Sequence, residues 1–361
     1  HLINEDMLKQ CHKELDGSKA VGIDKVTKEE YGKNLDRYIK DLVQRLKNKS
    51  FKPLPSLRVY IPKANGKKRP LGIASYEDKI VQMAVKKILG AIYEPRFLNC
   101  MYGFRLNRGC HEAIKEVYQR ISYGKISYIV DADIKGFFDH IDHGWMMKFL
   151  EWNIQDKNLL WLIRKYLKAG IMEQGKFEPT EEGSAQGSVM SPMLANIYMH
   201  HVLTLWFKLV VKKEMQGECF LVNFADDFVA GFQYKSEAER YYKELKERME
   251  KFGLELESSK SRLIEFGRFA EQNRRARGEH KPETFDFLGF TFYCSKNRKG
   301  GFASKVQTSR KKFEQKVRAY KNWIYDNRNR PMREIIKELN VKLIGHYRYY
   351  GVTRTYGSVR G

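Results

Sequence analysis

A pair of adjacent aspartates between two short apolar runs is the feature that most constrains this chain. Residues 220–232 read Phe-Leu-Val-Asn-Phe-Ala-Asp-Asp-Phe-Val-Ala-Gly-Phe, which predicts two strands joined by a tight hairpin with Asp226 and Asp227 at the turn. Neighbouring carboxylates repel each other unless a cation lies between them. Because Mg²⁺ takes carboxylate oxygens and keeps positions open for substrate phosphates, the pair favours a metal site, although a solvated turn would also explain it.

The composition favours a globular protein that meets a polyanion. The chain of 361 residues exceeds the usual single-domain size, and 42% hydrophobic residues suffice for a packed core. Of the formal net charge of +23, +14 falls on residues 295–361, which hold 18 Lys and Arg against 4 Asp and Glu. Aromatic residues are interleaved with these charges, so contact with nucleic acid is favoured over a merely solvated basic face.

Two other classes of protein are disfavoured. The chain has no apolar run of the roughly 18 residues that a membrane span needs, and it shows no signal peptide. The 5 cysteines form no Cys-x-x-Cys pair and leave one over, so neither a zinc site nor a disulfide framework is expected. We therefore expect a cytoplasmic protein without a membrane partner.

A second acidic segment precedes the hairpin. Residues 128–134 read Tyr-Ile-Val-Asp-Ala-Asp-Ile, a buried-strand pattern in which period-two alternation places Asp131 and Asp133 on the same face. Acids on a strand together with an acid pair on a hairpin suit two-metal phosphoryl transfer, because the two ions stabilise the attacking and leaving oxygens.

The remaining periodicity predicts a mixture of helices and strands. Helical spacing is found at 33–48, 76–93, 145–168, 191–211 and 236–252, and strand patterns at 57–61, 69–73, 262–266 and 285–293. Residues 268–283 are expected to form a polar, basic loop. Helices are expected to close the chain, with Val306, Phe313 and Ile324 on one face and Pro331 opening the last helix.

The order of these motifs resembles the reverse transcriptase family, and within it the bacterial group II intron-encoded, maturase-like type. The resemblance covers about residues 20–351 and rests on stretches at 58–63 with 69–73, 102–108, 133–139, 185–192 with 194–196, 224–227 and 287–290. Two positions depart from the family pattern. Phe224 stands where the family usually has Tyr, and Ala185 stands where it usually has Pro.

The resemblance implies an α+β, right-hand polymerase with fingers, a palm whose antiparallel sheet packs on helices, and a helical thumb. The implied domains are an N-terminal helical extension at 1–50, fingers and palm at 51–294, and a basic helical thumb at 295–361. The implied activity is RNA-directed DNA polymerisation, with dNTPs added to a DNA or RNA primer along an RNA template. Two Mg²⁺ ions, or Mn²⁺ in their place, are the implied cofactors, and a specific structured RNA is the implied partner.

The same resemblance assigns site residues. Asp133, Asp226 and Asp227 would be the catalytic metal ligands together with Ile134, and Asp131 would be a supporting or salt-bridged residue. Nucleotide contacts are expected from Lys63, Arg69, Phe137, Phe138, Gln186, Gly187 and Lys260. One of the two phenylalanines would exclude a 2′-hydroxyl, and Lys260 would be either a proton donor to pyrophosphate or a surface lysine. Primer-grip residues are expected at Phe287, Leu288, Gly289 and Phe290, and further nucleic-acid contacts at Arg105, Arg108, Lys311, Lys312, Lys316 and Arg318.

Two alternatives to an intron-type polymerase stay open. A maturase-like splicing protein would keep the fold for RNA binding without needing catalysis, although it would have no physical reason to hold three carboxylates beside a phosphate backbone. A reverse transcriptase recruited to CRISPR spacer acquisition or to phage defence would keep the same motifs.

Overall fold

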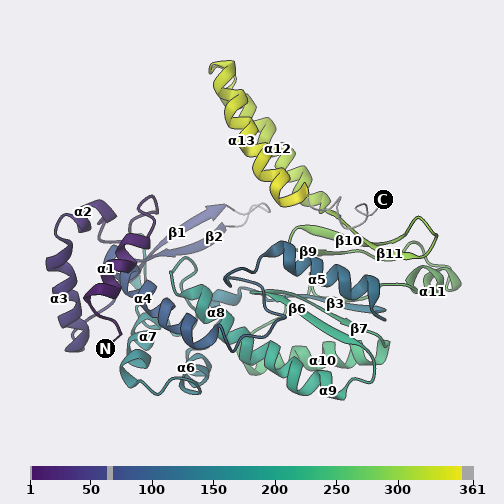
Figure 1. Cartoon of the computed structure of the whole chain (residues 1–361), viewed down its shortest axis with the longest axis horizontal. Coiled ribbons are helices and arrows are strands. Elements are labelled where there is room, and N and C mark those ends of the chain that lie inside the picture. Colours follow the sequence, from purple (N-terminus) through teal and green to yellow (C-terminus); the bar gives the residue numbers. More distant parts are fainter. Residues whose placement is uncertain (1, 63–67, 352–361) are drawn as a thin grey trace. The chain divides into compact units, whose positions relative to one another are not determined.

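The chain combines helices and sheets, as its sequence predicts for the α+β class (Figure 1). The computed structural model describes residues 2–62 and 68–351. Within these ranges the strands form sheets with the orders β2-β1-β4-β5, β6-β7-β3-β8 and β11-β10-β9. The chain divides into two compact units.

The first unit contains residues 1–105, 134–206 and 247–255. Its elements are α1 (Glu5–Glu14), α2 (Lys28–Gly32), α3 (Leu35–Lys47), β1 (Ser56–Pro62), β2 (Lys68–Ile73), α4 (Tyr76–Tyr93), α6 (His143–Glu151), α7 (Lys157–Leu167), β4 (Ile171–Glu173), β5 (Lys176–Glu178) and α8 (Ser191–Met199). The antiparallel hairpin β1–β2 is extended by β4, which pairs in parallel with the start of β1.

Helix α4 is the buried centre of this unit, because nine of its residues are inaccessible to solvent. Its first turn contains a buried carboxylate, that of Asp78. This carboxylate accepts hydrogen bonds from the Leu54 N–H at 3.1 Å, the Ser75 hydroxyl at 2.6 Å and the Tyr166 hydroxyl at 3.1 Å. Burial raises the pKa of Asp78 to about 6. The three donors compensate for burying the group and tie α7 and the segment before β1 to α4.

The second unit contains residues 106–133, 207–246 and 256–361. Its elements are α5 (Cys110–Tyr123), β3 (Tyr128–Asp133), α9 (Lys212–Glu214), β6 (Cys219–Phe224), β7 (Asp227–Phe232), α10 (Lys235–Lys251, whose last residues belong to the first unit), β8 (Arg262–Glu265), α11 (Ala270–Ala276), β9 (Phe285–Phe287), β10 (Phe290–Lys296), β11 (Phe302–Thr308), α12 (Arg310–Asn327) and α13 (Met332–Tyr350).

The sheet β6-β7-β3-β8 is the core of the second unit. Its central strands β7 and β3 run antiparallel and pair along their whole length. Helix α10 packs on the sheet through Tyr241, whose ring centroid lies 4.9 Å from that of Phe232 on β7. Because every second residue of β7 faces this helix, the alternate residues, beginning with Asp227, face the other way.

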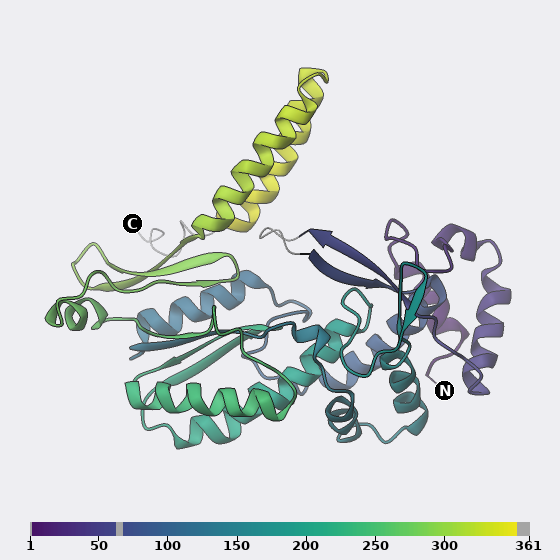
Figure 2. The same ribbon diagram turned by 180° about the vertical axis from the view of Figure 1, so that it is seen from behind.

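Helices α12 and α13 lie side by side as an antiparallel pair (Figures 1 and 2). The Tyr320 hydroxyl donates to the Lys342 carbonyl at 3.0 Å, and the Lys342 ammonium lies 5.0 Å from the centroid of the Trp323 ring. Pro331 precedes the first residue of α13, as predicted. Every residue of α12 keeps some exposure to solvent.

One predicted helix is in fact two. The stretch 145–168 divides into α6 and α7, because Asp156 caps a new helix by accepting from the N–H groups of Asn158 and Leu159 at 2.8 and 3.2 Å. An Asp side chain that bonds the backbone two and three residues ahead competes with helix continuation. The periodicity of apolar residues alone does not reveal such an N-cap.

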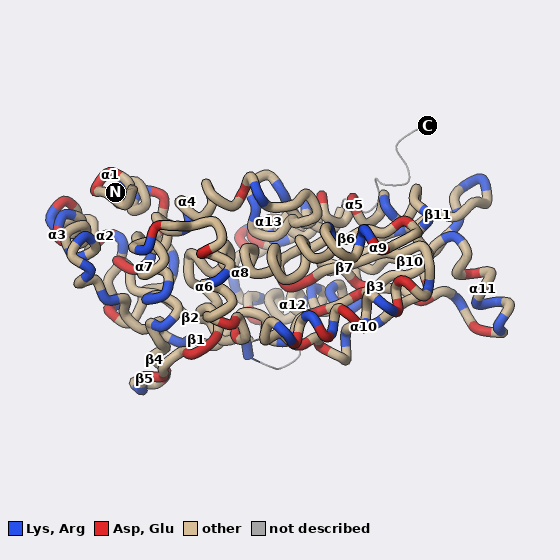
Figure 3. The backbone as a smooth tube through the Cα atoms, turned by 90° about the horizontal axis from the view of Figure 1, so that it is seen from below, with Lys and Arg blue, Asp and Glu red and all other residues tan. Residues whose placement is uncertain are grey.

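The predicted loop at 268–283 contains helix α11, and Lys and Arg positions recur around it (Figure 3). Arg277 forms ion pairs with Glu265 and Glu279 at 2.5 and 2.8 Å, and Arg274 contacts Glu283 at 3.2 Å. These pairs tie the helix to β8 and to the segment after it. They depend on the folded arrangement, so the hydrophobic pattern could not reveal them.

The predicted strand at 285–293 is interrupted. Leu288 and Gly289 turn the chain with φ angles of 51° and 82°, so β9 and β10 are separate, antiparallel strands. Val306, predicted to lie on a helix, lies instead on β11 opposite Phe292. The turn that allows β11 to return along β10 is closed by Asn297, whose Oδ1 accepts from the Gly301 N–H at 3.0 Å. The helical part of the C-terminal region therefore starts at α12, and the predicted boundary at residue 295 falls inside β10.

The helix predicted at 191–211 is present and continues to Glu214. At Ser191–Glu214 it is long and apolar enough to cross a membrane by length and composition, a property that we did not predict. It includes π-helical segments at His200–Thr204 and Phe207–Val211. Of its most apolar stretch, 67% is buried inside the protein. That degree of burial is typical of a core helix.

We expect Gly231→Ala to destabilise the protein by about 1–3 kcal/mol, because an added methyl overpacks the core. A Cβ at Gly231 would lie 2.1 Å from the ring of Phe220 on the neighbouring strand β6. The matched control is Gly345→Ala in the exposed part of α13, where no described atom lies within 4 Å of the new Cβ. This change should be neutral or stabilise by about 0.5–1 kcal/mol. Thermal and urea unfolding measure both, and equal losses would contradict the packing argument.

Candidate active site

The two adjacent aspartates lie at a two-residue hairpin turn, as predicted. Phe224 on β6 pairs with Asp227 on β7, which leaves Ala225 and Asp226 as the turn residues. Ala225 has a φ of 58°, a left-handed conformation that costs a non-glycine residue roughly 1 kcal/mol or more. The Asn223 side chain donates to the Ala225 carbonyl at 2.8 Å and so holds the turn in this conformation.

The carboxylates of two strands share one face of the sheet. Asp133, the last residue of β3, lies directly opposite Asp227, and Asp131 lies opposite Val229. Asp131 and Asp133 are two residues apart on a strand, so both project to the face on which Asp227 lies, as the sequence predicts. Directly opposed residues in a sheet have Cβ atoms about 4.5–5.5 Å apart, so the charges of Asp133 and Asp227 repel.

This crowding changes the proton affinity of the buried acids. The pKa of Asp227 is raised well above its usual range, first by burial and then by the charges of Asp131, Asp133 and Asp226. The backbone of Leu288 acts in the opposite direction and lowers the pKa of Asp227. Burial also raises the pKa of Asp131 to about 7, with Arg262 opposing the shift. Negative charge thus accumulates on this face of the sheet.

Lys260 supplies one positive charge to the cluster. Its ammonium contacts the Asp133 carboxylate, and this hydrogen bond raises the pKa of Lys260. The loop that carries Lys260 is fixed to the end of β3, because the Glu257 N–H donates to the Asp133 carbonyl at 2.8 Å and the Asp133 N–H donates to the Ser261 hydroxyl at 3.3 Å. The backbone of this loop therefore holds the lysine beside the acids.

The donor set suits a hard divalent cation. Carboxylate oxygens are the ligands that Mg²⁺ prefers, and the raised pKa of Asp227 marks a carboxylate that a metal would stabilise in its ionised form. Across residues 2–62 and 68–351, no three His, Cys, Asp or Glu side chains already converge as a ligand cage. Ile134, also predicted beside the metal, is buried and directly follows Asp133.

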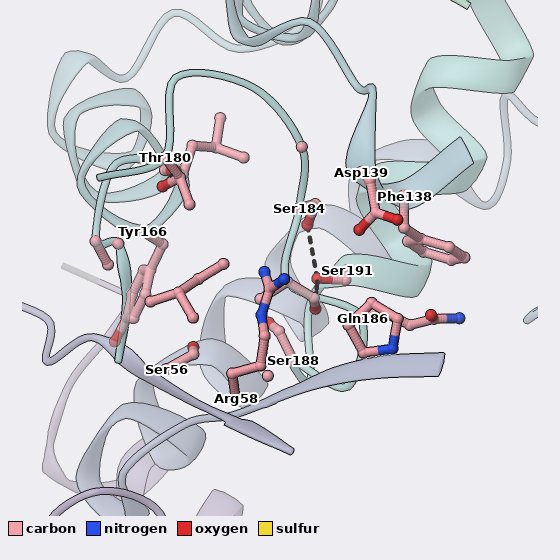
Figure 4. Close-up of a pocket in the computed structure, with 18 of the residues that line it drawn as sticks. Ser56, Arg58, Phe138, Asp139, Tyr166, Thr180, Ser184, Gln186, Ser188 and Ser191 are labelled. Atoms are coloured by element: carbon pink, nitrogen blue, oxygen red, sulfur yellow. Dashed lines mark hydrogen bonds between the residues drawn. The ribbon is translucent and has the colours of Figure 1, made fainter. Parts of the chain in front are cut away.

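One cavity of about 320 Å³ in the first unit is lined by two of the seven predicted nucleotide contacts (Figure 4). Phe138 and Gln186 line it, together with Arg58 of β1. The Gln186 carbonyl accepts from the Gly72 N–H at 2.7 Å, and the Phe138 carbonyl accepts from the Ser184 N–H at 2.7 Å. Backbone hydrogen bonds thus connect the Gln-Gly loop with strand β2 on one side and with the Phe-Phe segment on the other.

The two phenylalanines differ in exposure. Phe137 is buried, with 2% of its surface accessible, whereas Phe138 is half-buried and lines the cavity. Gly187 has a φ of 112°, and a Cβ there would lie 3.0 Å from the Gly72 carbonyl oxygen, so only glycine fits this turn without strain. Arg69 is exposed on β2, and Lys63 lies outside the described residues.

The predicted nucleic-acid contacts fall into two groups. Arg105 forms intramolecular hydrogen bonds. Its guanidinium donates to the Glu94 carboxylate at 3.0 Å and to the Leu98 carbonyl at 2.9 Å, and its side chain is only 8% exposed. This geometry favours a structural role. Arg108 is half-buried in the loop before α5. The exposed residues, all on α12, are Lys311, Lys312, Lys316 and Arg318.

The predicted primer-grip residues form the turn between β9 and β10. Phe287 and Phe290 are buried, and Leu288 and Gly289 occupy the left-handed turn. We did not predict Asp286, which adds to the charge near Asp131 and accepts from the Ser309 hydroxyl at 2.8 Å. The alternation of residues 285–287 could have indicated that this acid faces away from the two buried phenylalanines.

The fold and the carboxylate cluster are compatible with a nucleotide polymerase of the palm type, and comparison with known proteins gives the family. Residues 61–292 match the model of the family described as "Reverse transcriptase (RNA-dependent DNA polymerase)". The chain belongs to this family, and the matched stretch is an RNA-dependent DNA polymerase domain, which implies a polymerase palm and fingers. The resemblance inferred from the motifs is confirmed.

The relatives refine this assignment. The chain is 41% identical over 180 residues to the group II intron-encoded protein LtrA of Lactococcus lactis subsp. cremoris, covering 50% of this chain and 30% of that protein. It is 37% identical over 187 residues to protein YkfC of Escherichia coli K12, covering 51% of this chain and 49% of that protein. An uncharacterized 91 kDa protein in a cob intron of Schizosaccharomyces pombe is 39% identical over 45% of this chain and 20% of its own length. The matches thus span less than half the length of each relative.

We expect Lys260→Met to make the protein more dependent on divalent cations. Without the ammonium, the metal-free carboxylates lose a counter-ion, and since Lys260 is largely exposed the cost is at most about 1 kcal/mol. Mg²⁺ should then raise the melting temperature more in the variant than in wild type, because no ammonium competes with the ion. Thermal unfolding in EDTA and in Mg²⁺ measures this, with exposed Lys281→Met as control. An identical Mg²⁺-induced shift in all three proteins would refute the counter-ion role.

Proposed function

We propose that the chain copies an RNA template into DNA by adding dNTPs to the 3′ end of a DNA or RNA primer. The observation that carries the proposal is the placement of Asp133 directly opposite Asp227, with Asp226 in the adjoining two-residue turn. A divalent metal pair held there would stabilise charge on the attacking and leaving oxygens of an in-line displacement. Asp133, Asp226 and Asp227 would hold the ions, with the Ile134 position beside them.

The chain's own residues have distinct tasks in this proposal. Arg69 and Lys63 would bind the triphosphate, Arg through a planar fork and Lys as a point charge. Gln186 and Gly187, on a loop fixed to β2 by its backbone, would orient the nucleotide. Lys260, already hydrogen-bonded to a proposed ligand, would donate a proton to the departing pyrophosphate.

The domain assignment is also proposed. Residues 1–50 would be an extension, 51–294 the fingers and palm, and the basic C-terminal region from 295 the thumb. The exposed Lys311, Lys312, Lys316 and Arg318 on one helix support a thumb that follows the template–primer duplex by its phosphates. The group II intron-encoded relative favours a structured intron-type RNA as the partner.

We expect Asp133→Ala, Asp226→Ala and Asp227→Ala each to lower primer extension by about 10³-fold or more, because metal ions supply several kcal/mol of transition-state stabilisation. Binding of RNA should change little, since affinity comes from basic residues elsewhere. Asp131→Asn should be milder. Steady-state extension on an RNA template and filter binding measure the two properties. Substantial extension by any one alanine variant would overturn the ligand assignment.

We expect Phe138, and not Phe137, to exclude ribonucleotides, because Phe138 lines the cavity whereas Phe137 is buried. Phe138→Val should raise rNTP relative to dNTP incorporation by at least about tenfold, as removing steric bulk relaxes discrimination by that order. Phe137→Val is the matched control: it should lower stability but leave the ratio unchanged. Single-nucleotide extension with each substrate gives the ratios. A larger change in the Phe137 variant would reverse the assignment.

A further inference from the structure

Helix α4 is hydrogen-bonded to the loop that carries Gln186 and Gly187. The side-chain oxygen of Gln82 on α4 accepts from the Ser188 hydroxyl at 3.0 Å and from the Val189 N–H at 3.1 Å. Gln82 is 4% exposed and Ser188 is 7% exposed. Because these groups are buried, they depend on each other as hydrogen-bond partners.

The two donors determine which atom of the Gln82 amide faces the loop. A backbone N–H can only donate, so the atom beside Val189 is the amide oxygen and not the nitrogen. A single acceptor thus fixes the side chain of Ser188 and the backbone of the next residue. A side chain without an acceptor at this position cannot replace Gln82.

Ser188 also closes the turn on which two proposed nucleotide contacts lie. Its N–H donates to the Ala185 carbonyl at 3.0 Å, so Gln186 and Gly187 are the central residues of a four-residue turn. The Gln186 carbonyl accepts from the Gly72 N–H at 2.7 Å. The turn is therefore held on β2 through Gln186 and on α4 through Ser188.

The conformation of Gly187 explains why these anchors matter. Its φ of 112° is one of many conformations that glycine reaches at little cost, so the turn has little conformational preference of its own. If the Gln82 oxygen is removed, a buried hydroxyl and a buried N–H lose their acceptor. Leaving both unpaired is costly, so the loop gains by moving toward new partners, and Gln186 moves with it.

We propose that Gln82 is a positioning residue that holds the turn at Gln186 and Gly187 beside the cavity and thereby sets the affinity for the incoming nucleotide. Gln82 lines this cavity together with Ser188 and Gln186, and the latter two are labelled in Figure 4. The inference rests on the proposed function, since it assumes that Gln186 and Gly187 contact the dNTP. It adds a residue of α4 that acts through the loop.

Three variants isolate the acceptor. Gln82→Met has an unbranched side chain of similar length without an oxygen, so both donors lose their partner. Gln82→Glu is the conservative rescue, because a carboxyl group keeps an acceptor oxygen whether or not it is protonated. Ser75→Ala is the stability control: it removes a buried hydroxyl that bonds Asp78 at the start of the same helix and not the loop.

The experiment uses the full chain with an RNA template and a DNA primer. Single-nucleotide extension gives kcat and the dNTP KM, filter binding gives the template–primer Kd, and thermal unfolding gives the melting temperature. For Gln82→Met we expect the dNTP KM to rise about 5–50-fold, as losing two hydrogen bonds predicts, with a smaller fall in kcat and an unchanged template–primer Kd. Gln82→Glu should restore most of the nucleotide affinity. Ser75→Ala should lower the melting temperature and leave the KM unchanged.

A purely structural role for Gln82 would give a different pattern. A lower melting temperature of Gln82→Met with an unchanged dNTP KM, or an equal rise in KM for Ser75→Ala, would overturn the inference. If Gln82→Met does not fold, Ser188→Ala serves in its place, because it removes only one of the two donors. Its KM should rise about 2–10-fold, and an unchanged KM would overturn the inference as well.

Gln186→Ala, assayed in parallel, separates this inference from the proposed function. A wild-type dNTP KM in Gln186→Ala would reject the proposed nucleotide contact itself, and no extension by the wild-type chain would reject the proposed activity. A raised KM in Gln186→Ala beside an unchanged KM in Gln82→Met would reject the positioning role alone.

Discussion

The repulsion between Asp133 and Asp227, placed directly opposite each other on β3 and β7, is the constraint on which the rest of the second unit depends. Like charges in directly opposed positions destabilise a sheet. The pairing is maintained because β3 and β7 are the two central strands, with β8 and β6 on their outer sides. Their apolar residues fix the register, and a slip of one residue would turn every side chain to the wrong face.

The segments around this pair supply partial positive charge. The loop before β8 brings the Lys260 ammonium to Asp133, and the backbone of Leu288 in the β9–β10 turn lowers the pKa of Asp227. Neither segment is a regular element, and each is held by backbone hydrogen bonds to its surroundings. They offset the repulsion only in part, so a hard cation bound on this face would relieve the repulsion that remains.

Sequence reasoning succeeded where the signal is local. The Asp-Asp hairpin, the strand carrying Asp131 and Asp133, and helix α4 follow from alternation, helical periodicity and turn residues, and the structure confirms them. It failed where contacts between distant segments of the chain determine the local structure. Val306 fits a helical face by spacing, yet hairpin pairing with Phe292 makes it part of a strand. Alternation indicates the face on which Asp286 lies but not its partner Ser309, which comes from a distant segment of the chain.

The two-residue turn at Ala225 and Asp226 has a consequence for how the gene can change. Adding or deleting one residue in this hairpin would shift Asp227 to the α10 side of the sheet and bury its charge among aromatic rings. The turn between β10 and β11 closes on exposed residues around Gly300 and carries no such restriction. Length variation among descendants of this chain should therefore accumulate at the second hairpin and be absent from the first.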